Sequence, residues 1–96
     1  MSYDVTIGDE HFNYTYNLAQ FFKHHDARPV EWDGQKAGAV APLIADAFPR
    51  ISLRGPVELD SYNPYNGWGS WQGATVWLTD VMIACLENPD ATVEAT

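Results

Sequence analysis

The chain opens with alternating hydrophobic and polar residues. Tyr3, Val5 and Ile7 fall on every second position, which is the period of a half-buried strand. Gly8 and two acidic residues follow directly. The pattern therefore predicts a short strand over residues 3–7.

Helical spacing replaces this alternation in the next segment. Apolar residues recur at intervals of three and four, which predicts a helix over residues 16–25 with this stripe: Leu18, Phe21, Phe22 and His25. Residues 11–17 are rich in Asn and aromatic residues, and we interpret them as a turn that leads into the helix. Three of them carry side chains that commonly cap helices: Asn13, Thr15 and Asn17.

A second apolar stripe predicts a helix over residues 34–48, with Asp33 as its N-cap. Pro42 interrupts this stripe. Inside a helix, proline removes a backbone donor and collides with the preceding turn, at a cost of roughly 3 kcal/mol. Two outcomes stay open: a kink at Pro42, or two short helices with Pro42 in the first turn of the second. We expect Pro49 to end the pattern.

The clearest periodic segment predicts a helix over residues 70–87, with Ser70 as its N-cap and Asn88-Pro89 as its end. Before it, residues 57–59 are ambiguous between a short strand and a helical turn. After it, residues 91–95 predict a strand, and its expected partner is the strand at residues 3–7, because chain termini often lie close together.

These elements predict an α+β, mostly helical fold in which three helices pack with a short β-ribbon formed by the N- and C-terminal strands. The chain has 96 residues, 46% of them hydrophobic, which suffices for one core. We therefore expect residues 1–96 to form a single compact domain.

Charge narrows the choice of partners. The formal net charge is −8, and no Lys or Arg follows Arg54. Proteins that bind nucleic acids or anionic membranes need clusters of basic residues, so we expect neither partner here. The acidity is compatible with a protein partner that has a basic surface. Without an N-terminal leader or a long apolar stretch, we expect a cytoplasmic protein.

Residues 62–71 hold the most distinctive candidate site. Their sequence, Tyr-Asn-Pro-Tyr-Asn-Gly-Trp-Gly-Ser-Trp, combines turn-forming residues with flat aromatic faces and amides. The candidate binding residues are Asn63, Tyr65, Asn66 and Trp68. His11, Asn13 and Tyr14 are candidates for the opposite wall of the same pocket. The alternative is that both segments only form turns and cap helices, with their aromatic residues in the core.

Other candidate chemistry is weaker. Glu58, Asp60 and Asp80 are candidates for an acidic partner surface. Adjacent histidines such as His24 and His25 diverge on a helix, so we expect no metal site and no cofactor. The single cysteine lies on an apolar helix face, where a core role is expected. No catalytic motif is present, which favours a binding protein over an enzyme.

The two aromatic segments also carry a resemblance. Asn13-Tyr14-Thr15-Tyr16-Asn17 and Asn63-Pro64-Tyr65-Asn66-Gly67-Trp68-Gly69-Ser70 before a last amphipathic helix resemble a group of short uncharacterised proteins encoded by phages and prophages of actinobacteria. The likeness extends over most of the chain, including residues 34–48. It implies a phage setting, with action inside the host cell, and no particular activity.

Four functions stay open at this point. The leading one is a protein-binding inhibitor of a host enzyme or defence complex. The alternatives are a binder of a small ligand such as a nucleotide signal, a minor virion-associated structural protein, and an enzyme. A homodimer is a further possibility, because four Trp and five Tyr exceed what a small core must hide.

Overall fold

The chain begins with a β-hairpin. In the computed structural model, which describes residues 1–96, β1 (Ser2–Ile7) pairs antiparallel with β2 (Glu10–Thr15) through a turn in which Gly8 has a φ of 60°. The predicted strand at residues 3–7 is confirmed. The prediction that residues 11–17 form a turn is wrong for all but their last two residues. Phe12 and Tyr14 alternate with polar residues as in any half-buried strand, but the Asn and Thr between them suggested a turn.

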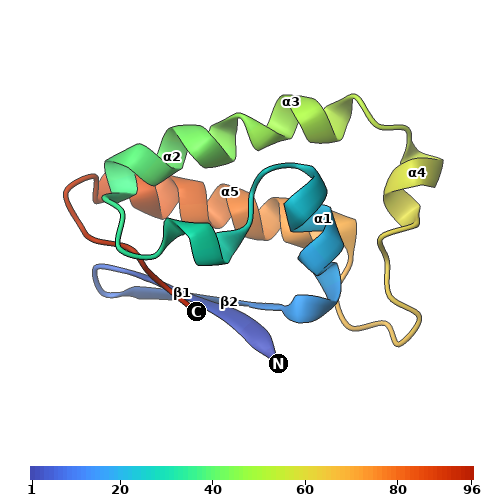
Figure 1. The fold of residues 1–96 in the computed structure, drawn as a ribbon, viewed down its shortest axis with the longest axis horizontal. Helices are drawn as coiled ribbons and strands as arrows, with labels where there is room; N and C mark the ends of the chain where they lie inside the picture. The colour runs from blue at the N-terminus through green and yellow to red at the C-terminus, as the bar shows by residue number, and fades with distance from the viewer.

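Both edges of β1 are paired. β3 (Glu94–Ala95) runs antiparallel along the edge opposite β2, with Val5 facing Ala95, so the strand order is β2-β1-β3. Figure 1 shows the C-terminal segment returning beside the first strand. The predicted pairing of the two ends is confirmed, and the α+β fold with it. The sheet is larger than the predicted ribbon, because β2 adds a third strand.

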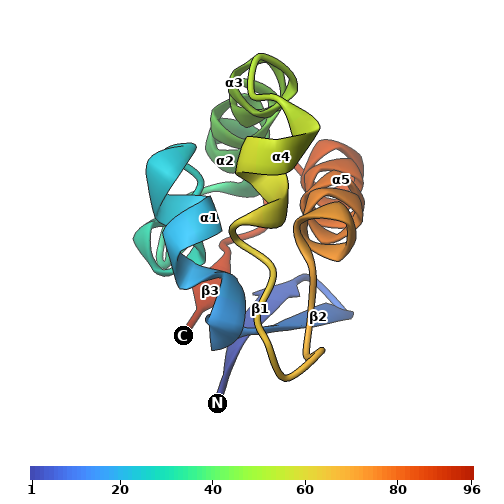
Figure 2. The ribbon, with the colours of Figure 1, turned by 90° about the vertical axis from the view of Figure 1, so that its right-hand side faces the viewer.

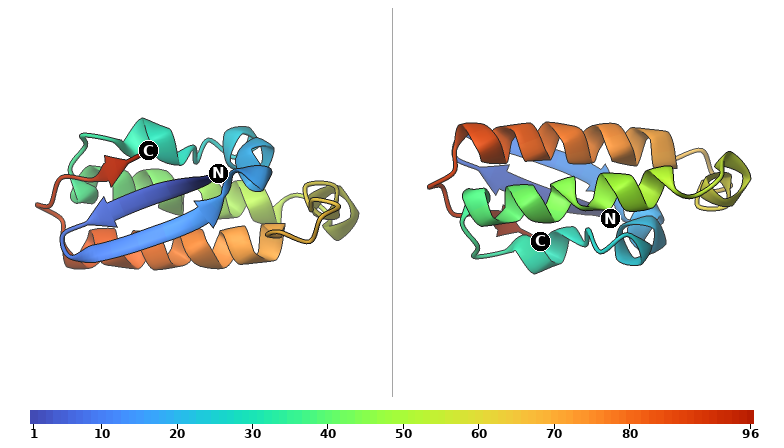
Figure 3. Two further views of the ribbon diagram at one scale, coloured as in Figure 1. Left: turned by 90° about the horizontal axis from the view of Figure 1, so that it is seen from below. Right: turned by 90° about the horizontal axis from the view of Figure 1, so that it is seen from above.

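Helices cover only one face of this sheet, as Figure 2 shows. The side chains of Tyr3, Val5 and Ile7 point into the core beneath the helices. The intervening residues of the hairpin form three cross-strand pairs on the opposite face: Ser2 with Thr15, Asp4 with Asn13, and Thr6 with His11. This outer sheet face is polar and uncovered (Figure 3, left).

The first helix follows the hairpin without a break. A 3-10 turn, Tyr16–Leu18, leads into α1 (Ala19–His24), close to the predicted bounds of 16–25. Thr15 caps the 3-10 turn, because its hydroxyl accepts a hydrogen bond of 3.1 Å from the Asn17 amide. A second 3-10 turn, Pro29–Trp32, follows, and its last residue, Trp32, is buried in the core.

The predicted helix over residues 34–48 is instead two helices, α2 (Ala37–Ala45) and α3 (Ala47–Ser52). The division into two helices is observed, but it lies at Asp46: α2 continues through Pro42, which therefore does not open the second helix. Pro49 does not end the pattern either, because it lies in the first turn of α3, where its missing amide donor costs nothing. Asp33 caps no helix, and its side chain accepts a hydrogen bond from the Ala95 amide.

The last helix matches its predicted bounds. α5 spans Trp71–Glu87, and the Ser70 hydroxyl accepts a hydrogen bond of 2.9 Å from the Gly73 amide. Before it, α4 (Pro56–Asp60) shows that the ambiguous segment is helical. α5 lies over β2 and α2 packs along α5, so the helices form two levels above the sheet (Figure 2). Trp32 and Trp77 stack between them with ring centroids 6.2 Å apart.

One buried polar side chain joins α1 to the loop that follows α3. His25 is fully buried, and its Nδ1–H donates to the Phe21 carbonyl at 2.6 Å. Its Nε2 accepts from Nε of Arg54 at 2.8 Å, which identifies the neutral form of the ring. Burial, followed by the charges of Arg54 and Arg50, holds the pKa of His25 below its usual value, against the opposing effect of the Phe21 hydrogen bond.

A first prediction concerns close packing between α5 and β2. A Cβ at Gly73 would collide with the Tyr14 hydroxyl. Gly73→Ala should therefore destabilise the protein by roughly 1–3 kcal/mol, despite the gain of about 1 kcal/mol in helix propensity. In a Tyr14→Phe background the collision is removed, and the same substitution should become neutral or stabilising. Urea denaturation of the four proteins in this double-mutant cycle measures both effects. Equal effects of Gly73→Ala in both backgrounds would contradict the packing.

A second prediction follows from the depressed pKa of His25. The unfolded chain binds this proton near pH 6.5, whereas the folded chain binds it only at lower pH. The stability contributed by neutral His25 is therefore complete above pH 6.5 and is lost as the pH falls through the lowered folded pKa. Urea denaturation from about pH 7.5 to 5 should show a smaller acid-dependent loss in His25→Gln than in the wild type. Gln20→Ala, at an exposed and non-titratable position of α1, is the control and should keep the wild-type pH dependence.

Candidate functional site

The two Asn- and aromatic-rich segments meet at the Thr15 end of the hairpin. The Asn17 side chain donates to the Trp68 carbonyl at 3.2 Å and to the Asn66 side-chain oxygen at 3.4 Å. These bonds join the start of the first helical turn to the Asn63–Ser70 loop, the connection between α4 and α5. Sequence alone did not establish that the segments are neighbours.

Tyr14 fixes the base of this loop. Its hydroxyl donates to the Ser70 carbonyl at 3.0 Å and accepts from the Ser70 amide at 3.1 Å. Gly69 packs beside it with a φ of 92°, and a Cβ there would lie 2.6 Å from the Thr15 methyl group. A side chain at this position would be both strained and crowded, so glycine allows the loop to lie flat on the hairpin.

The amide side chains of the loop shape its backbone. The Asn66 side-chain oxygen accepts from the Trp68 amide at 3.0 Å, around Gly67 with a φ of 74°. The Asn63 oxygen accepts from the Trp71 amide at 2.8 Å and so satisfies one of the free donors at the start of α5. Both oxygens are used within the loop, so a bond from either of these two side chains to a ligand would come chiefly from its amide nitrogen.

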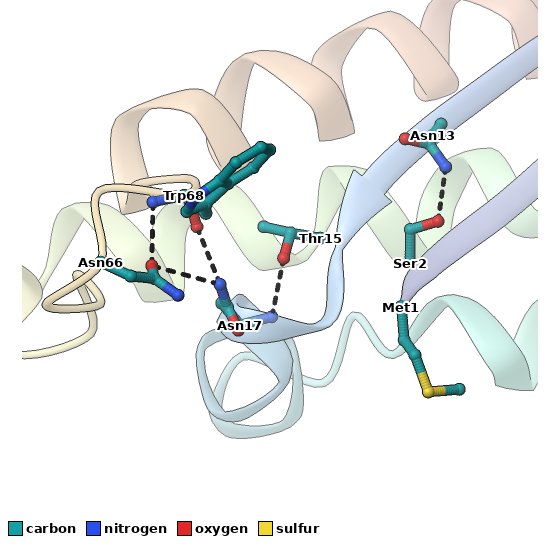
Figure 4. Close-up of a pocket in the computed structure, with 7 residues that line it drawn as sticks. All are labelled: Met1, Ser2, Asn13, Thr15, Asn17, Asn66 and Trp68. Atoms are coloured by element: carbon teal, nitrogen blue, oxygen red, sulfur yellow. Dashed lines mark hydrogen bonds between the residues drawn. The ribbon is translucent and has the colours of Figure 1, made fainter.

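A shallow pocket of about 490 Å³ opens where the loop meets the hairpin. Figure 4 shows its lining, which combines three asparagines with hydroxyls and two apolar side chains: Met1, Ser2, Asn13, Thr15, Asn17, Asn66 and Trp68. None of these side chains carries a charge. The pocket can therefore offer hydrogen bonds and one aromatic face, but it has no cationic side chain for a phosphate.

Two aromatic side chains of the loop project into solvent. Trp68 is 72% exposed and Tyr65 is fully exposed, so neither belongs to the core. Aromatic residues usually bury much of their surface, and both are placed where a partner could cover them. Trp71, by contrast, is half-buried, and its indole N–H donates to Asp60 at 2.8 Å.

The outer sheet face beside the pocket carries a continuous polar network. The His11 ring lies between Thr6 and Asp4, with hydrogen bonds of 3.0 and 3.2 Å, and the Asn13 amide donates to Asp4 at 3.1 Å and to Ser2 at 2.7 Å. His11 therefore lies on the open sheet and does not line the pocket. Asp4, Thr6 and Ser2 were not identified from sequence, because that required the hairpin register.

Aspartate, histidine and a hydroxyl in this order also occur in nucleophilic enzymes. Here Asp4, His11 and Thr6 lie on a flat surface, and neither cavity of the structure is lined by His11 or Thr6. A substrate would have no walls to orient it there. The only thiol is no better suited, because burial raises the pKa of Cys85 to about 11.

The three predicted acidic residues do not form one patch. Glu58 pairs with Arg54, Asp60 accepts the Trp71 indole N–H, and Asp80 lies exposed more than two turns along α5. A second cavity of about 520 Å³ was also not anticipated from sequence. It is an apolar groove between α3, α4 and α5, whose walls include Phe48, Ile51, Leu59 and Trp71.

Comparison of the chain with models of known families, with curated proteins and with solved structures finds no match. None of its helices combines the length and apolar character needed to cross a membrane. The site therefore has to be interpreted from its own geometry.

A third prediction tests the connection between loop and hairpin. Asn17→Ala removes both side-chain hydrogen bonds to the loop and should cost about 1 kcal/mol of unfolding free energy. It should also speed hydrogen exchange of the amides at residues 63–69, because the loop loses its anchor. Gln20→Ala, one turn further and exposed, is the matched control. Unchanged exchange in Asn17→Ala would show that Tyr14 alone holds the loop.

Proposed function

We propose that the protein acts by binding another protein, through a surface formed by the Asn63–Ser70 loop and the outer sheet face. The exposed pair Tyr65 and Trp68 carries this proposal. Binding energy at protein interfaces is concentrated in a few aromatic and arginine anchors, surrounded by polar groups that exclude water. The amides of the adjoining pocket and the polar residues of the sheet supply such surroundings.

Electrostatics support a partner with a basic surface. No Lys or Arg lies on the outer sheet face or in the pocket, whereas Asp4 and Glu94 lie on that face. Four of the five basic residues are engaged within the fold: Arg28 with Glu31, Lys36 with the Asp90 carbonyl, Arg50 with the His25 carbonyl, and Arg54 with Glu58 and His25. A net charge of −8 also favours approach to a positive surface.

The proposed setting comes from the resemblance to actinobacterial phage proteins. In that setting the partner is a host enzyme or a host defence complex, the protein acts in the host cytoplasm, and binding blocks the partner. A minor structural role in the virion uses the same surface against another phage protein.

A second candidate function rests on the pocket itself. Its three asparagines and the Trp68 face suit a small polar ligand that is neutral, because no basic side chain lines it. The observed lining speaks against a nucleotide, whose phosphates need cationic or clustered amide donors. Saccharides present hydroxyls and apolar ring faces and therefore fit this chemistry better.

A fourth prediction tests protein binding. Immobilised wild-type protein should recover one stoichiometric protein from a lysate of the source cells, and Trp68→Ala or Tyr65→Ala should weaken this association at least about ten-fold. Leu53→Ala and Val57→Ala are matched controls, since both positions are 87% exposed and lie outside the loop, Leu53 at the end of α3 and Val57 in α4. The association should also weaken when salt is raised, because charge contributes to it.

Three results would contradict the proposal. Equal recovery by the loop variants and by the controls would show that the loop is not the binding surface. Native mass spectrometry that finds only a small molecule, in stoichiometric amount and lost in Asn66→Ala, would favour the pocket as the functional site. A dimer of the chain itself, disrupted by Trp68→Ala, would assign the exposed aromatics to self-association.

A further inference from the structure

The outermost strand of the sheet has a free edge. The Tyr16 amide donates to the Met1 carbonyl, so these two residues form a hydrogen-bonded pair. Hydrogen-bonded and non-hydrogen-bonded pairs alternate along an antiparallel ladder. The backbone groups of Tyr14, Phe12 and Glu10 therefore point toward β1. The backbone amide and carbonyl of Asp4 bond Thr96 on the opposite side of β1, and not the facing residue Asn13, which agrees with this register. The amide and carbonyl groups of His11 and Asn13 therefore point away from the sheet.

Nothing in β2 protects this edge. Natural proteins shield edge strands with proline, lysine, a bulge or a covering segment. β2 contains no proline and no lysine, its register with β1 is regular over all six residues, and no strand lies beyond it. Figure 3 (left) shows β2 as the last strand on its side, running across α5.

The exposed side of α5 borders the same edge. Gly73 and Trp77 contact Tyr14, and Asn88 contacts Glu10, so these residues mark the side of α5 that faces β2. The next row toward solvent, at spacings of four, three and four, consists of Val76, Asp80, Ile83 and Glu87. Val76 is 61% and Ile83 45% exposed, so this row alternates uncovered apolar and acidic side chains.

We propose that β2 and this row of α5 form a groove that binds an extended peptide segment in which every second residue faces α5 and these facing residues are alternately apolar and basic (lysine or arginine). The segment adds a strand to the free edge through His11 and Asn13. Successive side chains of a strand point to opposite faces, so the residues that contact α5 are two apart in the segment. The apolar ones contact Val76 and Ile83, and the basic ones meet Asp80 and Glu87. Strand addition takes its affinity from main-chain bonds and its specificity from alternate side chains.

A second copy of the chain does not fit this edge. Paired strands lie about 4.8 Å apart, whereas packed helices need about 8–10 Å between their axes. α5 lies over β2, so joining two β2 edges would bring two α5 helices closer than they can pack. The like charges of two chains, −8 each, oppose the contact as well. A bare strand without its own covering helix meets neither obstacle.

This inference rests on the proposed function and specifies the partner further: the bound protein contributes an extended basic and apolar segment. The test uses synthetic peptides of about eight residues in which valine and lysine alternate at every second position, with threonine between them, added to the intact protein. Hydrogen exchange of the His11 and Asn13 amides should slow at least about ten-fold at saturation. The amides of Phe12 and Tyr14, which already bond β1, should change little. The same peptide with glutamate in place of lysine should not bind.

Backbone methylation of the peptide separates strand addition from general attraction. Methylating the peptide amides that face β2 should weaken binding at least about ten-fold, whereas methylating the amides that face away should not. On the protein, Val76→Arg should weaken binding. Leu86→Arg is its matched control, because Leu86 is 62% exposed on the side of α5 turned away from β2.

Each outcome decides the matter. Equal effects of the two methylation patterns, or unprotected amides at His11 and Asn13, would overturn the proposal while leaving a partner bound by Trp68 untouched. Slow exchange of the same amides without peptide, in a dimer seen by size-exclusion chromatography, would assign the edge to a second copy. If the peptides bind as expected but no partner depends on Trp68, then the result supports the groove proposal and contradicts the proposal that the loop binds a partner.

Discussion

The contact between Tyr14 and Ser70 determines the arrangement of most other parts. One phenol hydroxyl both donates to and accepts from the backbone of Ser70, immediately before α5 begins. This contact sets the start of the longest helix above β2 and holds the Asn63–Ser70 loop against the hairpin. It requires glycine at two nearby positions, Gly69 and Gly73, because any Cβ there would occupy the space of Thr15 or Tyr14. Loop, pocket and helix placement thus share one origin.

Helices with strong periodic faces could be predicted from sequence, and so could their caps where the chemistry was local. Ser70 and the bounds of α5 are the clearest case. Errors arose where tertiary context outweighed local preference. β2 was interpreted as a turn because Asn and Thr favour turns, although pairing with β1 satisfies the backbone groups of Glu10, Phe12 and Tyr14. Pro42 was expected to kink its helix or to begin a second one, but α2 continues through it, because the gain from burying Val40, Ala41 and Ile44 outweighs the local cost of the proline.

The candidate site shows the same limit. Sequence identified Asn13, Tyr14, Asn66 and Trp68, since amides and aromatics in turns are conspicuous, and the structure brings them to one end of the hairpin. The sequence alone could not show that Tyr14 is structural whereas Trp68 is exposed, because this distinction depends on packing. Nor could it identify Asp4 and Thr6, whose contacts with His11 exist only in the observed register. The free edge of β2 was likewise inaccessible before the strand itself was recognised.

The central position of β1 has a consequence for folding. Its two neighbours come from opposite ends of the sequence: β2 follows directly, whereas Val5 meets Ala95 only after nearly the whole chain has been ordered. Closing so long a loop costs chain entropy before the contact returns any energy, and folding rates fall as such distant contacts accumulate. We infer that the hairpin forms early, whereas β3 and the hydrogen bond from its Ala95 amide to Asp33 form late. Until then β1 has a second unpaired edge, which makes the partly folded chain prone to pair with other chains.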